Sequence, residues 1–167
     1  MTRWMPTRNS LNRLAALALF TVGLALLAGC GGGTTTTAAT SPTAEVEKYR
    51  DELKPTNEGL ESARHTLETV RFTGSNYSEI SGAFVTYLYA YRAYIRELEQ
   101  THAPLSVAKA AESYVARLRQ HLTNLEDASK AAAGHHGAAL SAALEKARAS
   151  ARECASAASF YAEACRW

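Results

Sequence analysis

Two cysteines near the carboxyl end of the chain are the first side chains with reactive chemistry. Cys154 and Cys165 are eleven residues apart, and the pattern around them predicts one helix, so about 16 Å separates them along its axis. A disulfide needs Cα atoms within about 7 Å, so these two thiols cannot bridge each other within that helix. Both fall on the apolar face, where cysteine behaves as a small hydrophobic residue. We expect two buried, unreactive thiols, of which Cys165 is the better placed for a bond to another molecule.

Histidines and carboxylates show no spacing that is typical of a metal or catalytic site. A di-iron bundle needs Glu-x-x-His on two helices and two further glutamates, whereas Glu61 and His65 are four residues apart and have no second copy. The sequence contains neither the Cys-x-x-Cys-His of haem attachment nor the Gly-x-Ser-x-Gly of a nucleophilic serine. We therefore expect no metal, no cofactor and no catalysis. The alternative is a metal or haem site, with His135-His136, in a glycine-flanked turn, as a weak candidate for a divalent metal.

Three tyrosines form a stripe of their own. Tyr87, Tyr91 and Tyr94 follow one another at steps of four and three residues, which places them on one face of a helix. A buried tyrosine hydroxyl needs a hydrogen-bond partner, and a small polar cavity would supply one. Core packing is the commoner arrangement for such a stripe. The alternative is a ligand-binding bundle, in which these three side chains line a cavity for an apolar or aromatic molecule.

Four apolar stripes with helical spacing position these side chains. The first helix is expected to begin at Ser41-Pro42, with Ser41 as its N-cap, and to continue as one kinked helix through Pro55 because the stripe keeps its phase. The second begins at Asn76-Tyr77-Ser78-Glu79, which has the form of a capping box. Pro104 opens the third, and Ala133–Gly137 is the next turn. The stripes are Val46, Tyr49, Leu53, Leu60, Ala63, Leu67 and Val70; Tyr77, Ile80, Phe84, Tyr87, Tyr91, Tyr94 and Leu98; Ala108, Ala111, Val115, Leu118, Leu122 and Leu125, with Tyr114 and His121 on the flank; and Leu140, Leu144, Ala147, Ala151, Cys154, Ala158, Tyr161 and Cys165.

The lengths of these helices predict the architecture. Each has roughly 27–31 residues, and short connections between helices make neighbours antiparallel. Large aromatic residues of the second helix can pack against the alanines of the last. The sequence therefore predicts an all-α protein, an antiparallel up-down-up-down four-helix bundle.

The first thirty residues have a different composition. Met1–Arg13 carries three arginines and no carboxylate, and Leu14–Ala28 is an uncharged run of about fifteen residues, shorter than the ~20 that a membrane-spanning helix needs. A basic segment followed by a short apolar one is typical of a secretory signal peptide. The run ends in Leu27-Ala28-Gly29-Cys30, which resembles the lipobox of bacterial lipoproteins. The resemblance implies that a diacylglyceryl group is attached to the sulfur of Cys30 and that the chain is cut just before it.

This interpretation divides the chain into three parts. Residues 1–29 are a lipoprotein signal peptide, residues 30–43 are the lipidated cysteine with a flexible Gly/Thr linker that reaches about 20 Å, and residues 44–167 are the bundle domain. The expected location is the cell envelope. The acyl chains, palmitate among them, would hold the protein at the outer face of the cytoplasmic membrane or at the outer membrane.

Charge limits the range of partners. Without the three arginines of the signal peptide, fifteen basic and sixteen acidic residues remain, a net charge of −1. A nucleic-acid-binding domain needs a clustered basic face, so we expect no nucleic acid partner. We expect a membrane-tethered bacterial lipoprotein that binds the membrane through Cys30 and whose helical bundle is an interaction or scaffold domain, with an envelope protein as its partner.

Overall fold

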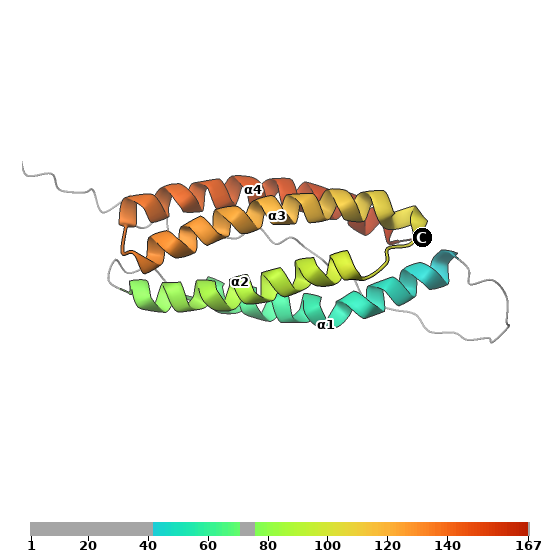
Figure 1. The fold of residues 1–167 in the computed structure, drawn as a ribbon, viewed down its shortest axis with the longest axis horizontal. Coiled ribbons are helices and arrows are strands. Elements are labelled where there is room, and N and C mark those ends of the chain that lie inside the picture. The colour runs from blue at the N-terminus through green and yellow to red at the C-terminus, as the bar shows by residue number, and fades with distance from the viewer. Residues whose placement is uncertain (1–41, 71–75, 167) are drawn as a thin grey trace, which may run out of the picture.

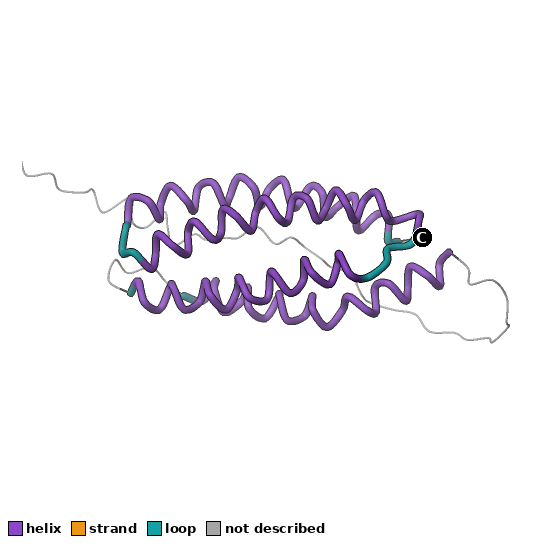
Figure 2. The backbone as a smooth tube through the Cα atoms, in the orientation of Figure 1, coloured by secondary structure: helices purple, strands orange, loops and turns teal. Residues whose placement is uncertain are grey.

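The fold is an all-α, up-down-up-down four-helix bundle, as predicted. The computed structural model describes residues 42–70 and 76–166, so the predictions for the signal peptide, Cys30, the Ser41 N-cap and the linker up to residue 41 lie outside the described residues. Residues 42 and 43, the end of the predicted linker, are helical. Its helices are α1 (Pro42–Thr69), α2 (Tyr77–Gln100), α3 (Leu105–Ala133) and α4 (Gly137–Ala164). Successive helices run in opposite directions, with α1 and α2 in one layer and α3 and α4 in the other (Figure 1). Short loops connect α2 to α3 and α3 to α4 (Figure 2).

The first helix passes through a proline without ending. Pro42 is its first residue, as predicted, and Pro55 lies inside it. Proline has no backbone N–H and its ring crowds the preceding turn, so the helix bends rather than stops there. Figure 1 shows this change of direction near the middle of α1. The prediction of one kinked helix is confirmed.

The second helix begins where predicted, but the capping box is wrong. Asn76 occupies the N-cap position and makes no side-chain capping bond. Its backbone, with φ −95° and ψ 41°, is not the extended conformation that directs an N-cap side chain toward the first-turn N–H groups. Its Nδ2 instead donates to Glu79 Oε2 at 2.9 Å. At 24 residues α2 is also shorter than predicted.

The turn between α3 and α4 is confirmed and has Schellman geometry. The N–H of His136 donates to the carbonyl of Ala131 and that of His135 to Ala132, both at 3.0 Å. His135 has φ 57°, the left-handed region that glycine or asparagine usually occupies at this position. Its ring stacks on Tyr77, with 4.9 Å between centroids. This contact connects the turn to the start of α2.

The buried stripe of α3 differs in phase from the prediction. Tyr114 and His121, expected on the flank, are buried at the centre, whereas Val115 and Leu122 are half-buried. The true stripe consists of Val107, Ala111, Tyr114, Leu118, His121, Leu125, Ala128 and Ala132. It alternates steps of four and three without a break, but two of its members have polar tips. A prediction from apolarity alone therefore chose the neighbouring rows of the helix, which contain Val115 and Leu122.

The predicted stripe of α4 is buried in full. Both α4 and α3 bury several alanines, among them Ala128 and Ala132 of α3, and these two helices make the most extensive backbone approach in the bundle. Small side chains permit this because little volume separates the two backbones. The large side chains of α2 are also buried in this core, and their predicted packing against the alanines of α4 stays a prediction.

Candidate functional site

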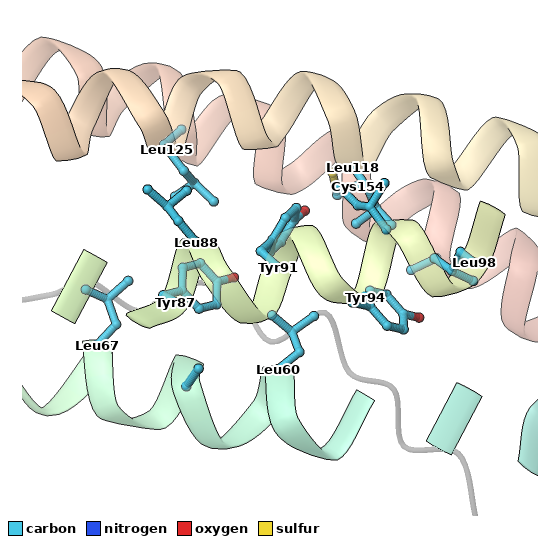
Figure 3. Packing of buried hydrophobic residues seen from close by; sticks show 14 of the residues in the cluster. Leu60, Leu67, Tyr87, Leu88, Tyr91, Tyr94, Leu98, Leu118, Leu125 and Cys154 are labelled. Carbon is cyan, nitrogen blue, oxygen red and sulfur yellow. The ribbon is translucent and has the colours of Figure 1, made fainter. Parts of the chain in front are cut away.

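The three predicted tyrosines lie in the core. Tyr87, Tyr91 and Tyr94 are 5%, 3% and 1% exposed. Tyr87 extends toward Leu60 and Leu67 of α1, while the hydroxyl of Tyr91 points toward Cys154 of α4 (Figure 3). The rings of Tyr87 and Tyr91 meet edge to face, with centroids 5.6 Å apart. These contacts are those of core side chains, and a ligand cavity beside them stays a prediction.

Tyrosines from the other three helices extend this group, which the sequence did not show. Tyr94 meets Tyr114 edge to face at 6.5 Å, Tyr114 stacks on Tyr161 at 5.1 Å, and Tyr161 meets Tyr49 edge to face at 6.4 Å. We call these six residues (Tyr49, Tyr87, Tyr91, Tyr94, Tyr114 and Tyr161) the tyrosine cluster. Offset and edge-to-face pairs each add about 0.5–1.5 kcal/mol beyond area burial. The cluster therefore holds all four helices together.

Burial keeps the phenols of the cluster protonated. Desolvation raises the pKa of Tyr87 and Tyr94 above the ordinary value of 10.0. The buried hydroxyls of Tyr49 and Tyr91 make no hydrogen bond of good geometry, although Tyr49 lies beside Tyr161 and Tyr91 lies beside the thiol of Cys154. A buried hydroxyl without a partner costs about 1–3 kcal/mol. These two hydroxyls are the feature of the core that favours the ligand-binding alternative.

A buried polar triad joins α3 to α4. His121 Nδ1 and Asn124 Nδ2 each lie 2.9 Å from Ser150 Oγ. The hydroxyl of Ser150 donates its one hydrogen to the backbone carbonyl of Ala147, at 3.0 Å, or Lys146, at 3.1 Å. When that hydrogen lies on a carbonyl, the oxygen accepts from both neighbours, and the neutral imidazole then carries its proton on Nδ1.

This assignment decides what the His121–Ser150 pair can do. A general base must present an unprotonated nitrogen to the hydroxyl that it activates, whereas in this tautomer the nitrogen of His121 that faces Ser150 carries the proton. Burial lowers the pKa of His121 to about 4, against an opposing contribution from the carbonyl of Ala147. The imidazole therefore stays neutral at pH 7, and the pair connects two helices.

Cys154 of α4 and Cys165, which directly follows α4, are free and buried, as predicted. The thiol of Cys154 donates to the backbone carbonyl of Arg117 at 3.2 Å, and burial raises its pKa to about 11. Burial also raises the pKa of Cys165, which lies beside Arg50 of α1. Because the thiolate is the reactive form, both groups are poor nucleophiles at neutral pH.

A cleft of about 450 Å³ lies at the end of the bundle where α1 begins. It is lined by Glu45, Lys48, Tyr49, Glu52, Glu97, Gln100, Thr101, His102 and Pro104. Lys48 lies 3.7 Å from Glu52. The lining also contains Glu45 and Glu97, so it has an excess of negative charge. The residues come from α1, α2 and the α2–α3 connection, which only the fold brings together. No local sequence motif predicts such a cleft.

The other candidate residues lie apart from one another. His65 and His102 are exposed, and His135-His136 lie in the exposed α3–α4 turn. Within residues 42–70 and 76–166, no group of three His, Cys, Asp or Glu side chains is arranged to hold a metal ion. In the same part of the chain, none of the helices is sufficiently long and apolar to cross a bilayer.

The outer face of α2 exposes two large apolar side chains one turn apart. Val85 is 61% and Tyr89 is 78% exposed, and a spacing of four residues places them side by side. The half-exposed Arg92, one turn further on, pairs with Glu126 of α3 at 2.7 Å. We call Val85 and Tyr89 the α2 patch. An aromatic residue beside a charged rim is typical of a small protein-binding surface.

Comparison with known proteins finds no matching family model, curated protein or solved structure. The candidate sites therefore rest on the residues and geometry described above.

Proposed function

We propose that this chain is a bacterial lipoprotein, held at a membrane of the cell envelope through lipid on Cys30, whose bundle binds another envelope protein. The lipobox-like Leu27-Ala28-Gly29-Cys30 and the short apolar run before it support the anchor. The first helix begins at Pro42, so residues 31–41 separate it from the proposed lipid.

The location of the side chains that could do chemistry is the observation that supports an interaction role. His121, Ser150 and Cys154 are buried and bonded to groups within the bundle, whereas the α2 patch faces outward. A reaction needs its groups within reach of a substrate, and binding needs an exposed surface with apolar anchors. The geometry therefore supports binding by the outer surface better than it supports chemistry in the core.

Replacing Cys30 by serine is expected to remove the lipid. Cells fed an alkyne analogue of palmitate should label the wild-type chain, and Cys30→Ser should lose the label and leave the membrane fraction, because no acyl chains remain to hold it. The measurement is in-gel fluorescence of membrane and soluble fractions. Cys154→Ala is the control and should keep the label. A Cys30→Ser chain that is still labelled would contradict the anchor.

Contact between the α2 patch and a partner is the second test. A photo-crosslinking phenylalanine analogue in place of Tyr89 should give one discrete crosslinked product in intact cells, since the side chain is exposed beside Val85. Adding Val85→Asp should reduce its yield at least fivefold, because a charge replaces the apolar neighbour. The same analogue in place of Phe160, which is 68% exposed on α4, is the matched control. A product of equal yield from both positions, or one indifferent to Val85→Asp, would count against the patch.

A further inference from the structure

The four helices are not joined to one another in the same way. Ion pairs connect α2 to α3, through Arg92–Glu126 and Arg119–Glu99, and α3 to α4, through Arg117–Glu153. The His121–Ser150–Asn124 triad adds buried hydrogen bonds between α3 and α4. The second, third and fourth helices are thus cross-connected by polar side chains.

The ion pairs of α1 have a different arrangement. Among the described residues, every one of them joins two side chains of α1 itself. The pairs are Lys48–Glu52, Lys54–Glu58, Arg64–Glu61 and Arg64–Glu68. Arg64 Nε and Nη2 both donate to Glu61 Oε2, at 3.0 and 2.6 Å, so the guanidinium is bonded within its own helix. These pairs support α1 as a helix but do not attach it to its neighbours.

α1 is also the least buried helix. It buries six of its 28 residues, whereas α2, α3 and α4 each bury nine. Its backbone approaches that of α2 extensively, but that of α4 hardly at all, so the α1–α4 contact depends on side chains such as Tyr49 and Tyr161. Fewer buried apolar contacts mean a smaller free energy of local opening.

The sequence of α1 weakens it further. Pro55 removes one hydrogen bond from the middle of the helix. Gly59 follows one turn later, and a Cβ atom added there would meet nothing, so no tight packing requires this glycine. Glycine in an exposed helix interior lowers helix stability relative to alanine. Among the four described helices, only α1 has a proline inside it, whereas an exposed interior glycine also occurs in α2, at Gly82.

We propose that α1 opens from the bundle as a unit, while α2, α3 and α4 stay packed as a three-helix body. Opening uncovers the face of α2 and α4 that α1 covers, including Tyr87, Tyr161 and the thiol of Cys165. An amphipathic helix fits that face, since α1 is one. This opening goes beyond the proposed function and does not depend on the lipid.

The two cysteines report on this opening separately. Cys165 lies beside Tyr49 and Arg50 of α1, so removing α1 exposes it. Cys154 is bonded to the backbone of α3 and lies beside Tyr91 of α2, so it stays covered until the three-helix body unfolds. Alkylation of Cys165 thus measures the opening of α1, and alkylation of Cys154 measures global unfolding.

The test is alkylation by iodoacetamide, over a series of urea concentrations below the unfolding transition. The full chain is used as cells produce it, in detergent, and mass spectrometry counts each cysteine separately, Cys30 included. We expect Cys165 to react at least tenfold faster than Cys154 and with a weaker dependence on urea. Equal rates with equal urea dependence would mean that the bundle opens only as a whole and would overturn the proposal.

Two leucine-to-alanine variants distinguish the opening of α1 from global unfolding and from fraying at the end of α4. Leu60→Ala, in α1, should speed the alkylation of both thiols at least tenfold, because it weakens the closed state relative to both open ones. Leu125→Ala, in α3, should speed Cys154 at least tenfold and leave Cys165 within twofold. If Cys165 is instead exposed by fraying of the end of α4, Leu60→Ala will not speed it, and the proposal fails.

Hydrogen exchange of the unmodified protein gives a second measurement that needs no variant. Amides of α1 peptides should exchange at least tenfold faster than those of α3 and α4 at the same pH and temperature. If the amides of all four helices show the same protection from exchange, the proposal is overturned, whatever the variants do.

Discussion

Acidification from pH 7 to pH 4 is expected to lower the free energy of unfolding by about 3 kcal/mol through His121 alone. In the folded bundle burial lowers the pKa of this imidazole to about 4, whereas its ordinary value is 6.5. Between these values the unfolded chain binds a proton that the folded chain does not. Stability is therefore full above about pH 6.5, declines as the pH falls, and has lost this contribution near pH 4.

The measurement is urea denaturation followed by far-ultraviolet circular dichroism at half-unit steps of pH. His121→Gln keeps an N–H donor for Ser150 but cannot titrate. Between pH 7 and pH 4 its free energy of unfolding should therefore fall by about 3 kcal/mol less than that of the wild type. His102→Gln, which replaces an exposed histidine, should keep the wild-type profile. If the profiles of the wild type and His121→Gln run parallel, the buried imidazole does not control the acid response.

Truncation of Leu125 is expected to have an effect of the same order or larger. Leu125→Ala should lower the free energy of unfolding by 2–5 kcal/mol, because it removes buried methyl groups and leaves a cavity that the surroundings fill only in part. The side chain is 1% exposed and faces Leu88 of α2 (Figure 3). Closely packed helices on both sides limit how far that cavity can collapse.

Leu105→Ala is the matched control, because it makes the same chemical change in the same helix. Leu105 is the first residue of α3 and is 98% exposed, so its removal should change the free energy of unfolding by no more than about 0.5 kcal/mol. Both variants are compared by their urea midpoints at constant slope. Equal losses from the two variants would mean that burial of Leu125 contributes nothing particular to the core.

Most of the fold could be predicted from periodicity, because each helix buries one stripe. Every member of the predicted α4 stripe is buried, although the helix also buries Ala143 and Ser150, which the stripe did not include. The predicted α3 stripe was shifted because Tyr114 and His121 are each followed by a more apolar residue, Val115 and Leu122, so two adjacent rows competed. The polar tip of His121 weighs against burial until the fold supplies a partner. For His121 that partner is Ser150, 29 residues away.

Only part of the candidate site could be predicted from the sequence. Tyr87, Tyr91 and Tyr94 follow from one helix and lie in the core as its stripe predicts. Tyr49, Tyr114 and Tyr161 belong to other helices, and the alignment of one helix against the next decides which rings meet. The end cleft has the same origin, since Tyr49 and His102 lie 53 positions apart in the chain and line one cleft.

The number of helices also decides where an added domain would lie. A chain that reverses direction after each of four helices returns to the end from which it started, so α4 finishes beside the beginning of α1 (Figure 1). The α3–α4 turn lies at the opposite end, about 42 Å away by the length of the 28-residue α1. In the anchored protein proposed above, a reporter fused after α4 would crowd the bilayer. One inserted at the Gly134–Gly137 turn would project away from it.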